Sequence, residues 1–163
     1  MLQTTLVPHI FKEQGKLEEL FETRKIVEVE AASLAAQRII PQQILEMKHW
    51  IQEIETCVAR NDIEGISFRD IEFHRQIIIA TNNNTLAALV DSLADLLQDM
   101  RHESSNIPDL LPKIVRGHRE IMTAIENKDS EAARQAMENH LDEVAKQVKE
   151  FWQSQNDTKT GEV

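Results

Sequence analysis

Apolar residues recur at every third or fourth position along most of this chain, and this spacing constrains its fold more than any other feature. Among its 163 residues there are only 4 Gly, 4 Pro and 5 Phe, and no Tyr. Few helix breakers and few aromatic residues favour long helices over a sheet. We therefore predict an all-α fold, an antiparallel bundle of about six helices joined by short connections.

The periodic part of the chain is long enough for one domain with its own hydrophobic core. Residues 1–14 show little periodicity, so we expect them to form a linker or arm. Residues 15–157 should form the domain, and residues 158–163 a disordered tail.

Local signals predict where several helices begin and end. The first helix should begin near Lys16. Ser67 is a suitable N-cap for the third helix, which should run to about Thr81. The fourth helix should carry the apolar residues Leu86, Leu89, Leu93, Leu97 and Met100 and end in the polar stretch Glu103–Asn106.

The balance of charges argues against nucleic acid and membranes as direct partners. The formal net charge is −10 and there is no dense cluster of Lys or Arg, whereas a module that binds duplex DNA presents a basic face to the phosphates. No apolar run approaches the ~18 residues that span a bilayer, and the N-terminus lacks the profile of a signal peptide. Cys57 is the one cysteine, and a lone reduced thiol suits the cytosol. We therefore expect a cytoplasmic protein.

Five polar residues interrupt the apolar stripes that the helices should turn inward. Asp70 and His74 share one face of the third helix, because residues four apart are neighbours on a helix surface. Apolar residues also flank three polar residues on the first, fifth and sixth helices, namely Arg24, His118 and His140. A buried polar group without a partner costs roughly 1–3 kcal/mol, so this recurrence needs an explanation.

The spacing around one turn places two of these histidines at the same level along the axes of the last two helices. His118 lies about ten residues before the turn at 127–129, and His140 about eleven after it, with Asp129 as the N-cap of the last helix. In an antiparallel hairpin that rises ~1.5 Å per residue, both rings can meet at one point. Two or three imidazoles and one carboxylate form a normal first shell for Zn²⁺, Ni²⁺ or Mn²⁺, and an octahedral ion keeps open positions for water or a ligand.

Each of these residues also has a plainer interpretation. Asp70 stands three residues after Ser67 and would complete a capping box at the start of the third helix. A single histidine on an apolar stripe is more often a core or surface residue with an ordinary hydrogen-bond partner. Arg24 is either a buried structural arginine or a clamp for a carboxylate, which its planar guanidinium matches.

Three segments of the chain resemble one known family. They are Leu20–Arg38 (LFETRKIVEVEAASLAAQR), Asp70–Leu86 (DIEFHRQIIIATNNNTL) and His118–Leu141 (HREIMTAIENKDSEAARQAMENHL). In these segments the chain resembles the FCD-type C-terminal domain of the FadR subfamily of GntR transcription regulators. The third segment is the most specific, because it combines two histidines with the turn and its spacing.

The resemblance implies a divalent metal site. The family's metal pattern is Asp-x3-His followed by two separated histidines on later helices, with zinc as the leading ion and nickel or manganese as alternatives. The four ligands would be Asp70, His74, His118 and His140. In the family an arginine on the first helix often contacts the carboxylate of a ligand, and Arg24 occupies that place. Asn83 and Arg101 are further candidates for the lining of the ligand pocket.

The function implied by the resemblance is the sensing of a small carboxylate effector, such as a hydroxy acid or a sugar acid. Ligand binding would shift the helices of a homodimer, for which Leu89–Leu97 offers spare apolar positions. Family members normally carry an N-terminal winged helix-turn-helix domain that we do not find in these residues, so DNA is expected to bind only through such a domain. Either the chain is part of a longer protein, or the protein naturally lacks a DNA reader.

Two alternatives stay open at this point. A helical-bundle metalloenzyme would use an open position on the metal to activate water, although Glu72, the acid beside the four ligands, points off their face. A purely structural bundle would bind no ligand at all. The leading expectation is therefore a binding domain and not an enzyme.

Overall fold

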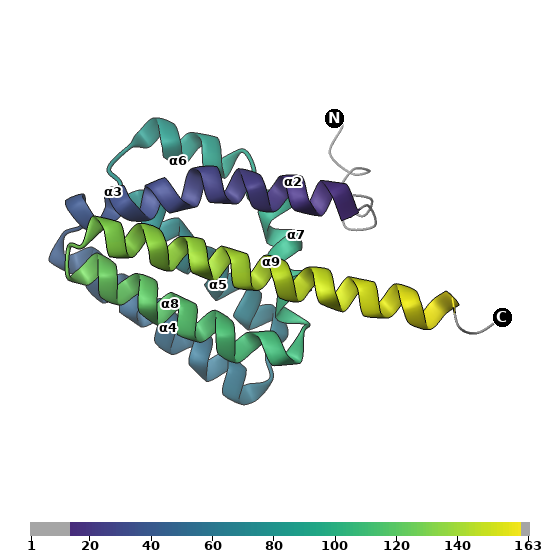
Figure 1. Ribbon diagram of the computed structural model, residues 1–163. Coiled ribbons are helices and arrows are strands. Elements are labelled where there is room, and N and C mark those ends of the chain that lie inside the picture. Colours follow the sequence, from purple (N-terminus) through teal and green to yellow (C-terminus); the bar gives the residue numbers. More distant parts are fainter. Residues whose placement is uncertain (1–13, 161–163) are drawn as a thin grey trace.

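The fold confirms the all-α prediction. The structure is a computed structural model that describes residues 14–160, and every regular element among these residues is a helix (Figure 1). In chain order the elements are α2 (Gln14–Arg24), the π-helical turn η1 (Lys25–Val29), α3 (Glu30–Arg38), α4 (Pro41–Arg60), α5 (Ile63–Ala80), α6 (Asn84–Asp91), α7 (Ala94–Ser105), the 3-10 turn η2 (Pro108–Leu110), α8 (Leu111–Glu126) and α9 (Ser130–Thr160). Residues 1–13 of the expected arm and 161–163 of the expected tail lie outside the described residues, whereas residues 158–160 are still helical.

The helices pack around a shared interior. α2, η1 and α3 form one continuous rod that lies along α9, and α9 reaches beyond the rest of the bundle toward the C-terminus (Figure 1). α8 packs against both α9 and α4, and α4 packs against α5. α3 contacts α5, α8 and α9. The inward polar residues come from α2, α5, α8 and α9.

Aliphatic side chains fill most of this interior. Met47, Ile54, Phe73 and Leu141 are fully buried. The buried residues of α3 are mostly alanines, whose small side chains let this helix approach its neighbours closely. Full burial of a large apolar side chain stabilises a fold by about 1.5–3 kcal/mol, so this core can hold the polar side chains that share the interior.

The prediction of Ser67 as an N-cap is wrong. Asn61 ends α4 in the left-handed conformation, with φ of 55°, and Asp62 caps α5 by accepting a hydrogen bond from Gly65 N at 2.9 Å. Ser67 is therefore buried inside the helix, and Asp70 belongs to no capping box. A Cβ on Gly65 would lie 2.1 Å from Asp62 Oδ2, so a glycine that resembles a helix breaker is what lets the cap form.

The predicted fourth helix is two helices. α6 ends at Asp91 and α7 begins at Ala94, with a turn at Ser92 and Leu93. The Ser92 hydroxyl donates a hydrogen bond to the backbone oxygen of Leu89 at 2.6 Å, and such local bonds compete with the helical pattern. The described residues therefore form one helix more than predicted, and α6 contributes no buried residue.

A π-helical turn in the first rod changes which residues face the interior. The regular period predicts Val27 and Leu34 on the inward stripe, but both are only half-buried. In η1 the buried residues are instead Glu28 and Val29. π-helical turns are rare and frequently lie at functional sites, so the carboxylate that this one turns inward needs a role.

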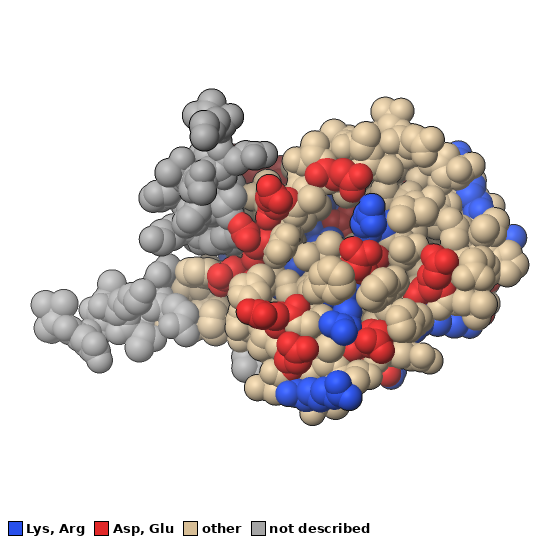
Figure 2. Space-filling model, turned by 180° about the vertical axis from the view of Figure 1, so that it is seen from behind, with Lys and Arg blue, Asp and Glu red and all other residues tan. Residues whose placement is uncertain are grey.

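The surface carries mixed charges. On the face shown in Figure 2, acidic and basic side chains are interspersed, and no continuous basic patch is visible. The mixture of charges on this face agrees with the net charge of −10. Among the described helices, none combines the length and the apolar character that crossing a bilayer requires.

Candidate metal centre

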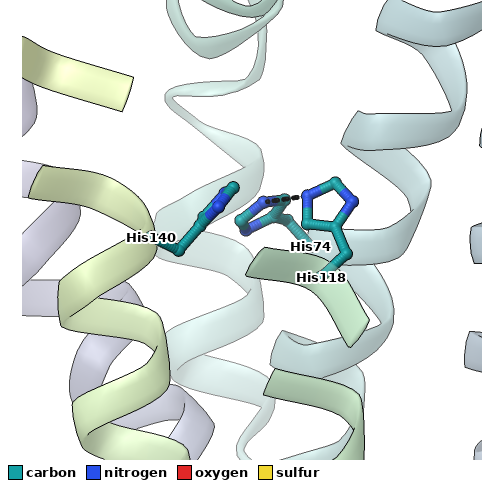
Figure 3. A group of neighbouring side chains, drawn as sticks. All are labelled: His74, His118 and His140. Carbon is teal, nitrogen blue, oxygen red and sulfur yellow. Dashed lines mark hydrogen bonds between the residues drawn. The ribbon is translucent and has the colours of Figure 1, made fainter. Parts of the chain in front are cut away.

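Three imidazole rings from three helices meet inside the bundle (Figure 3). His74 comes from α5, His118 from α8 and His140 from α9, and all three are buried. Their ring centroids lie 5.2 Å (His74–His118), 5.4 Å (His74–His140) and 4.9 Å (His118–His140) apart. One ring nitrogen of each residue lies within 4.8 Å of the other two. The structure thus brings together the three histidines singled out from the sequence.

The hairpin of α8 and α9 sets the height of two of these rings. Asp129 caps α9 by accepting a hydrogen bond from Ala132 N at 2.9 Å, which confirms the predicted turn. The turn is short, so His118 and His140 face each other across the hairpin as their distances from it predict.

Gly117 leaves the space that the His140 ring occupies. A Cβ at Gly117 would lie 2.4 Å from His140 Nδ1 and 3.0 Å from its Cγ, whereas ordinary van der Waals contacts are 3.4–4 Å. Glycine inside a helix costs about 1 kcal/mol relative to alanine, and here it lets the imidazole of α9 lie against the backbone of α8. Gly117 was not among the residues predicted for the site, although its place directly before His118 inside a predicted helix was a visible signal.

Asp70 joins the cluster from α5. Its Oδ1 lies 3.0 Å from His118 Nε2 and 4.0 Å from His74 Nε2. Its Oδ2 accepts a hydrogen bond from Arg101 Nη1 at 2.6 Å. One carboxylate oxygen therefore faces the imidazoles, and the other is held by a guanidinium on α7.

Glu28 is a second residue at this site that was not predicted from the sequence. Its Oε1 accepts a hydrogen bond from Arg24 Nε at 2.6 Å, and its Oε2 lies 2.6 Å from His74 Nδ1. Arg101 Nη2 lies 3.4 Å from Glu28 Oε1. Glu28 follows Arg24 by four residues, the spacing of neighbours on a helix, and this was the available signal.

The protonation states of the cluster suit a cation. Burial alone would raise the pKa of Glu28 and of Asp70, but Arg24 beside the first and Arg101 beside the second hold both well below their usual values. Burial lowers the pKa of His74 to about 4, with Arg101 adding to the effect, and burial with the two neighbouring histidines holds the pKa of His140 well below 6.5. At neutral pH the carboxylates are charged and these imidazoles are neutral, which is the state in which both bind metals.

Of the three ligand-pocket candidates, two lie at the cluster and one does not. Arg24 and Arg101 are buried there, but both guanidinium groups are already paired with carboxylates of this chain. Asn83 is exposed, and its side chain accepts a hydrogen bond from Leu86 N at 3.1 Å as the N-cap of α6. A cap residue that faces solvent is not available to line the interior.

Two small cavities adjoin the cluster. One has about 60 Å³ of free space and reaches Glu28, His74 and Arg101 from the side of α6 and α7. The other has about 10 Å³ and touches Arg24, Asp70, Arg101 and His140. Pockets for small molecules usually measure about 300–1,000 Å³, so this conformation of the centre is closed.

The donor set fits a divalent transition metal. His74 Nε2 and His118 Nε2 are 3.3 Å apart. Two nitrogen ligands at about 2.0–2.1 Å from one ion lie about 3.0–3.4 Å apart, depending on the angle between them. Neutral imidazoles with one carboxylate are ligands that zinc, nickel and manganese accept, so the side chains present match the group that the sequence predicts.

Comparison with known proteins covers the same stretch of chain. Residues 19–143 match the FCD domain family. The chain is 18% identical over 147 residues to the gluconate operon transcriptional repressor of Bacillus licheniformis and 28% identical over 138 residues to the Uxu operon transcriptional regulator of Escherichia coli K12. These alignments cover 87% and 82% of this chain but 60% and 54% of the relatives. The chain therefore spans little more than half the length of these curated relatives.

Solved structures agree with this result. The chain is similar to Streptococcus agalactiae GntR, with a TM-score of 0.68 and 26% identity over 88% of this chain and 62% of that one. It also superimposes on E. coli McbR/YncC with a TM-score of 0.75, over 85% of this chain and 70% of that one; at 18% identity this likeness concerns the fold alone. The curated relatives are transcription regulators, and nothing in the comparisons supports the metalloenzyme alternative.

Proposed function

Because the chain belongs to the FCD domain family, we propose that it is the effector-binding domain of a GntR-family transcription regulator and binds a small carboxylate at a metal centre. The observation that carries this proposal is the meeting of three buried imidazoles from α5, α8 and α9. A domain that only needed a core would gain more from apolar side chains at these positions, since buried polar groups cost free energy unless they are paired.

The residues that would hold the metal are Asp70, His74, His118 and His140. Zinc is our first choice, and nickel or manganese would suit the same ligands. When bound, the ion supplies positive charge and open coordination positions to an anionic ligand. The chain's own contribution is to hold the four side chains on rigid helices, with Arg101 fixing the orientation of Asp70.

The charges at the centre favour an anion. Two guanidinium groups, Arg24 and Arg101, balance two carboxylates, Glu28 and Asp70. A divalent ion then leaves the buried centre with two uncompensated positive charges, which a carboxylate reduces. One relative is named for the gluconate operon, and gluconate is a hydroxy acid, which supports this class of effector.

The closed cavities imply a conformational response. A free space of about 60 Å³ does not admit a sugar acid, so such a ligand must bind to a more open arrangement of the helices. A ligand shifts a conformational equilibrium only through different affinities for the two states, and here the states would differ in the space at the centre. In a homodimer joined to DNA-binding domains, this shift would change the distance between the two DNA-binding domains. Leu89, 52% exposed on α6, is one apolar side chain available to a partner copy.

Metal analysis and thermal unfolding test the proposal together. Purified protein should contain close to one divalent ion per chain, and a chelator should remove the ion and lower the melting temperature. Gluconate should raise the melting temperature of the metal-loaded protein more than that of the chelated protein. A protein that neither retains nor binds zinc, nickel or manganese would be the purely structural bundle, and the proposal would fail.

A further inference from the structure

Three side chains of the cluster contact one buried carboxylate, that of Glu28. Glu28 is 4% exposed and lies in the π-helical turn η1. Arg24 at the end of α2, His74 on α5 and Arg101 on α7 all reach it. A buried ion network is a weak stabiliser, because apolar side chains of the same volume often serve as well. The position of Glu28 therefore needs a reason beyond the stability of the fold.

Glu28 contacts the ring nitrogen of His74 that does not face His118. His74 Nε2 faces the cluster, 3.3 Å from His118 Nε2, whereas His74 Nδ1 is 2.6 Å from Glu28 Oε2. The Nδ1 contact is at ion-pair distance without full hydrogen-bond alignment in this conformation. A carboxylate at this place favours the proton on Nδ1 and leaves the lone pair of Nε2 free for a metal.

The other side chains at the centre show why this contact matters. Among the described residues, none forms a hydrogen bond with His118 Nδ1, so that ring has no comparable support. Asp70 is held from behind by Arg101, whose Nη2 also reaches Glu28. Glu28 thus influences two of the four side chains that would hold the ion, one directly and one through Arg101.

The carboxylate of Glu28 also accepts the hydrogen bonds of Arg24, the arginine that would bind the effector. Arg24 directs Nε and Nη2 to the two oxygens of Glu28, at 2.6 and 3.3 Å, in the forked geometry that a ligand carboxylate would use. The remaining nitrogen, Nη1, is 3.9 Å from Met100 Sδ. A ligand carboxylate that binds Arg24 in this fork must therefore take the place of Glu28.

We propose that Glu28 is a positioning residue that links the two halves of the site: it orients His74 for the metal, and it occupies the fork of Arg24 until an anionic ligand displaces it. This inference rests on the function proposed above. If Nε2 of His74 held a metal, its Nδ1 proton would be more acidic and would bind Glu28 more strongly, and Glu28 would then hold Arg24 less strongly. Metal and anion therefore promote each other's binding, as reciprocal linkage requires.

The substitution Glu28→Gln tests both halves with separate measurements. Zinc affinity is measured by competition with a chelator. We expect the dissociation constant for zinc to rise about 10–100-fold, which is the usual effect of removing a side chain that hydrogen-bonds to a metal ligand. Acetate binding is measured on the chelated protein by thermal shift, against chloride at equal ionic strength. Acetate should raise the melting temperature of E28Q more than that of the wild type, because Arg24 has lost its competitor. A merely structural role would lower stability and move neither binding response.

Glu30→Gln is the matched control. Glu30 lies two residues further on, is exposed and pairs with Arg134 at the surface, so E30Q should keep wild-type zinc and acetate responses. If E28Q does not fold, Glu28→Asp keeps a charge near Arg24 but withdraws it from His74, and should weaken zinc without increasing the acetate response.

The outcomes separate this inference from the proposed function. Zinc affinity of E28Q equal to that of the wild type, or an unchanged acetate response in the chelated protein, overturns the inference and leaves the metal site standing. A wild-type protein that binds no zinc overturns the metal site and the linkage together, and the acetate measurement then still decides whether Glu28 blocks Arg24.

Discussion

Replacement of Gly117 by alanine should disable the metal centre through one methyl group. The new Cβ would lie 2.4 Å from His140 Nδ1, and ordinary contact begins at 3.4 Å, so the ring and the helix must separate by about 1 Å. Metal–ligand distances in proteins vary by only about 0.2 Å, so a ring displaced by that much no longer completes the first shell. We expect zinc affinity to fall at least about 10-fold, which corresponds to about 1.4 kcal/mol.

The effect on stability should be smaller than the effect on metal binding. Overpacking in a core costs about 1–3 kcal/mol, but alanine is favoured over glycine in a helix by about 1 kcal/mol, so the two effects partly cancel in the metal-free protein. Chelator competition measures zinc affinity, and urea unfolding of the chelated protein measures stability. The absorption spectrum of the Co²⁺-loaded protein should also change, because it reports the number and geometry of the ligands.

Gly65→Ala is the control for this prediction. Its new Cβ would lie 2.1 Å from Asp62 Oδ2 and 2.8 Å from Cys57 Sγ, an equally tight place at the start of α5. This variant should lose stability and keep its zinc affinity. In the G117A background, His140→Ala should cause little further loss of zinc affinity, since both changes act on one ligand. If G117A binds zinc as the wild type does, or if the two losses simply add, the steric reasoning is refuted.

Three further predictions follow from the same geometry. His118→Ala should reduce zinc affinity more than about 10-fold, whereas His49→Ala at an exposed position should not. If chelator competition gives both variants the same zinc affinity, His118 is not a metal ligand. In the chelated protein the free energy of unfolding should fall as the pH is lowered from about 6.5 towards 4. Over this range the imidazole of His74 takes up a proton in the unfolded chain, but in the folded chain its pKa is about 4 and it stays neutral. A free energy of unfolding, measured with urea, that does not change over this range would contradict this prediction. Arg24→Lys should weaken the stabilisation of metal-loaded protein by gluconate, since an ammonium cannot form the forked contact, and its zinc affinity should stay within a few-fold of the wild type.

The histidines could be found from the sequence because their geometry depends on regular helices. His118 and His140 lie at similar distances from one turn, and an α-helix converts those distances directly into height. Asp70 and His74 lie four apart on one helix, so the face they share holds even though the start of that helix was misplaced at Ser67. An error at a helix end leaves the face of an interior residue unchanged.

Features that depend on departures from regular structure could not be found in this way. The π-helical turn η1 shifts the inward stripe, so Val27 was expected where Glu28 and Val29 are buried. Neither a glycine nor a proline marks this turn in the sequence. The break between α6 and α7 at Ser92 likewise carries no breaker residue in the sequence. Both departures lie where the sequence keeps the helical period and shows no breaker residue, so periodicity alone does not locate them.

The pairing of Arg24 with Glu28 changes the chemistry expected of the arginine, although its inward position was predicted correctly. An arginine with a free fork would attract a carboxylate on its own, and the metal would only add to the affinity. An arginine already neutralised inside the chain gives an incoming carboxylate only an exchange of partners, so little net charge attraction remains at Arg24. The attraction must then come from the metal's charge, and Glu28, which contacts both Arg24 and His74, is the group through which that charge would make the exchange favourable. A carboxylate should therefore bind this domain weakly without metal, which makes occupancy by metal a condition for sensing.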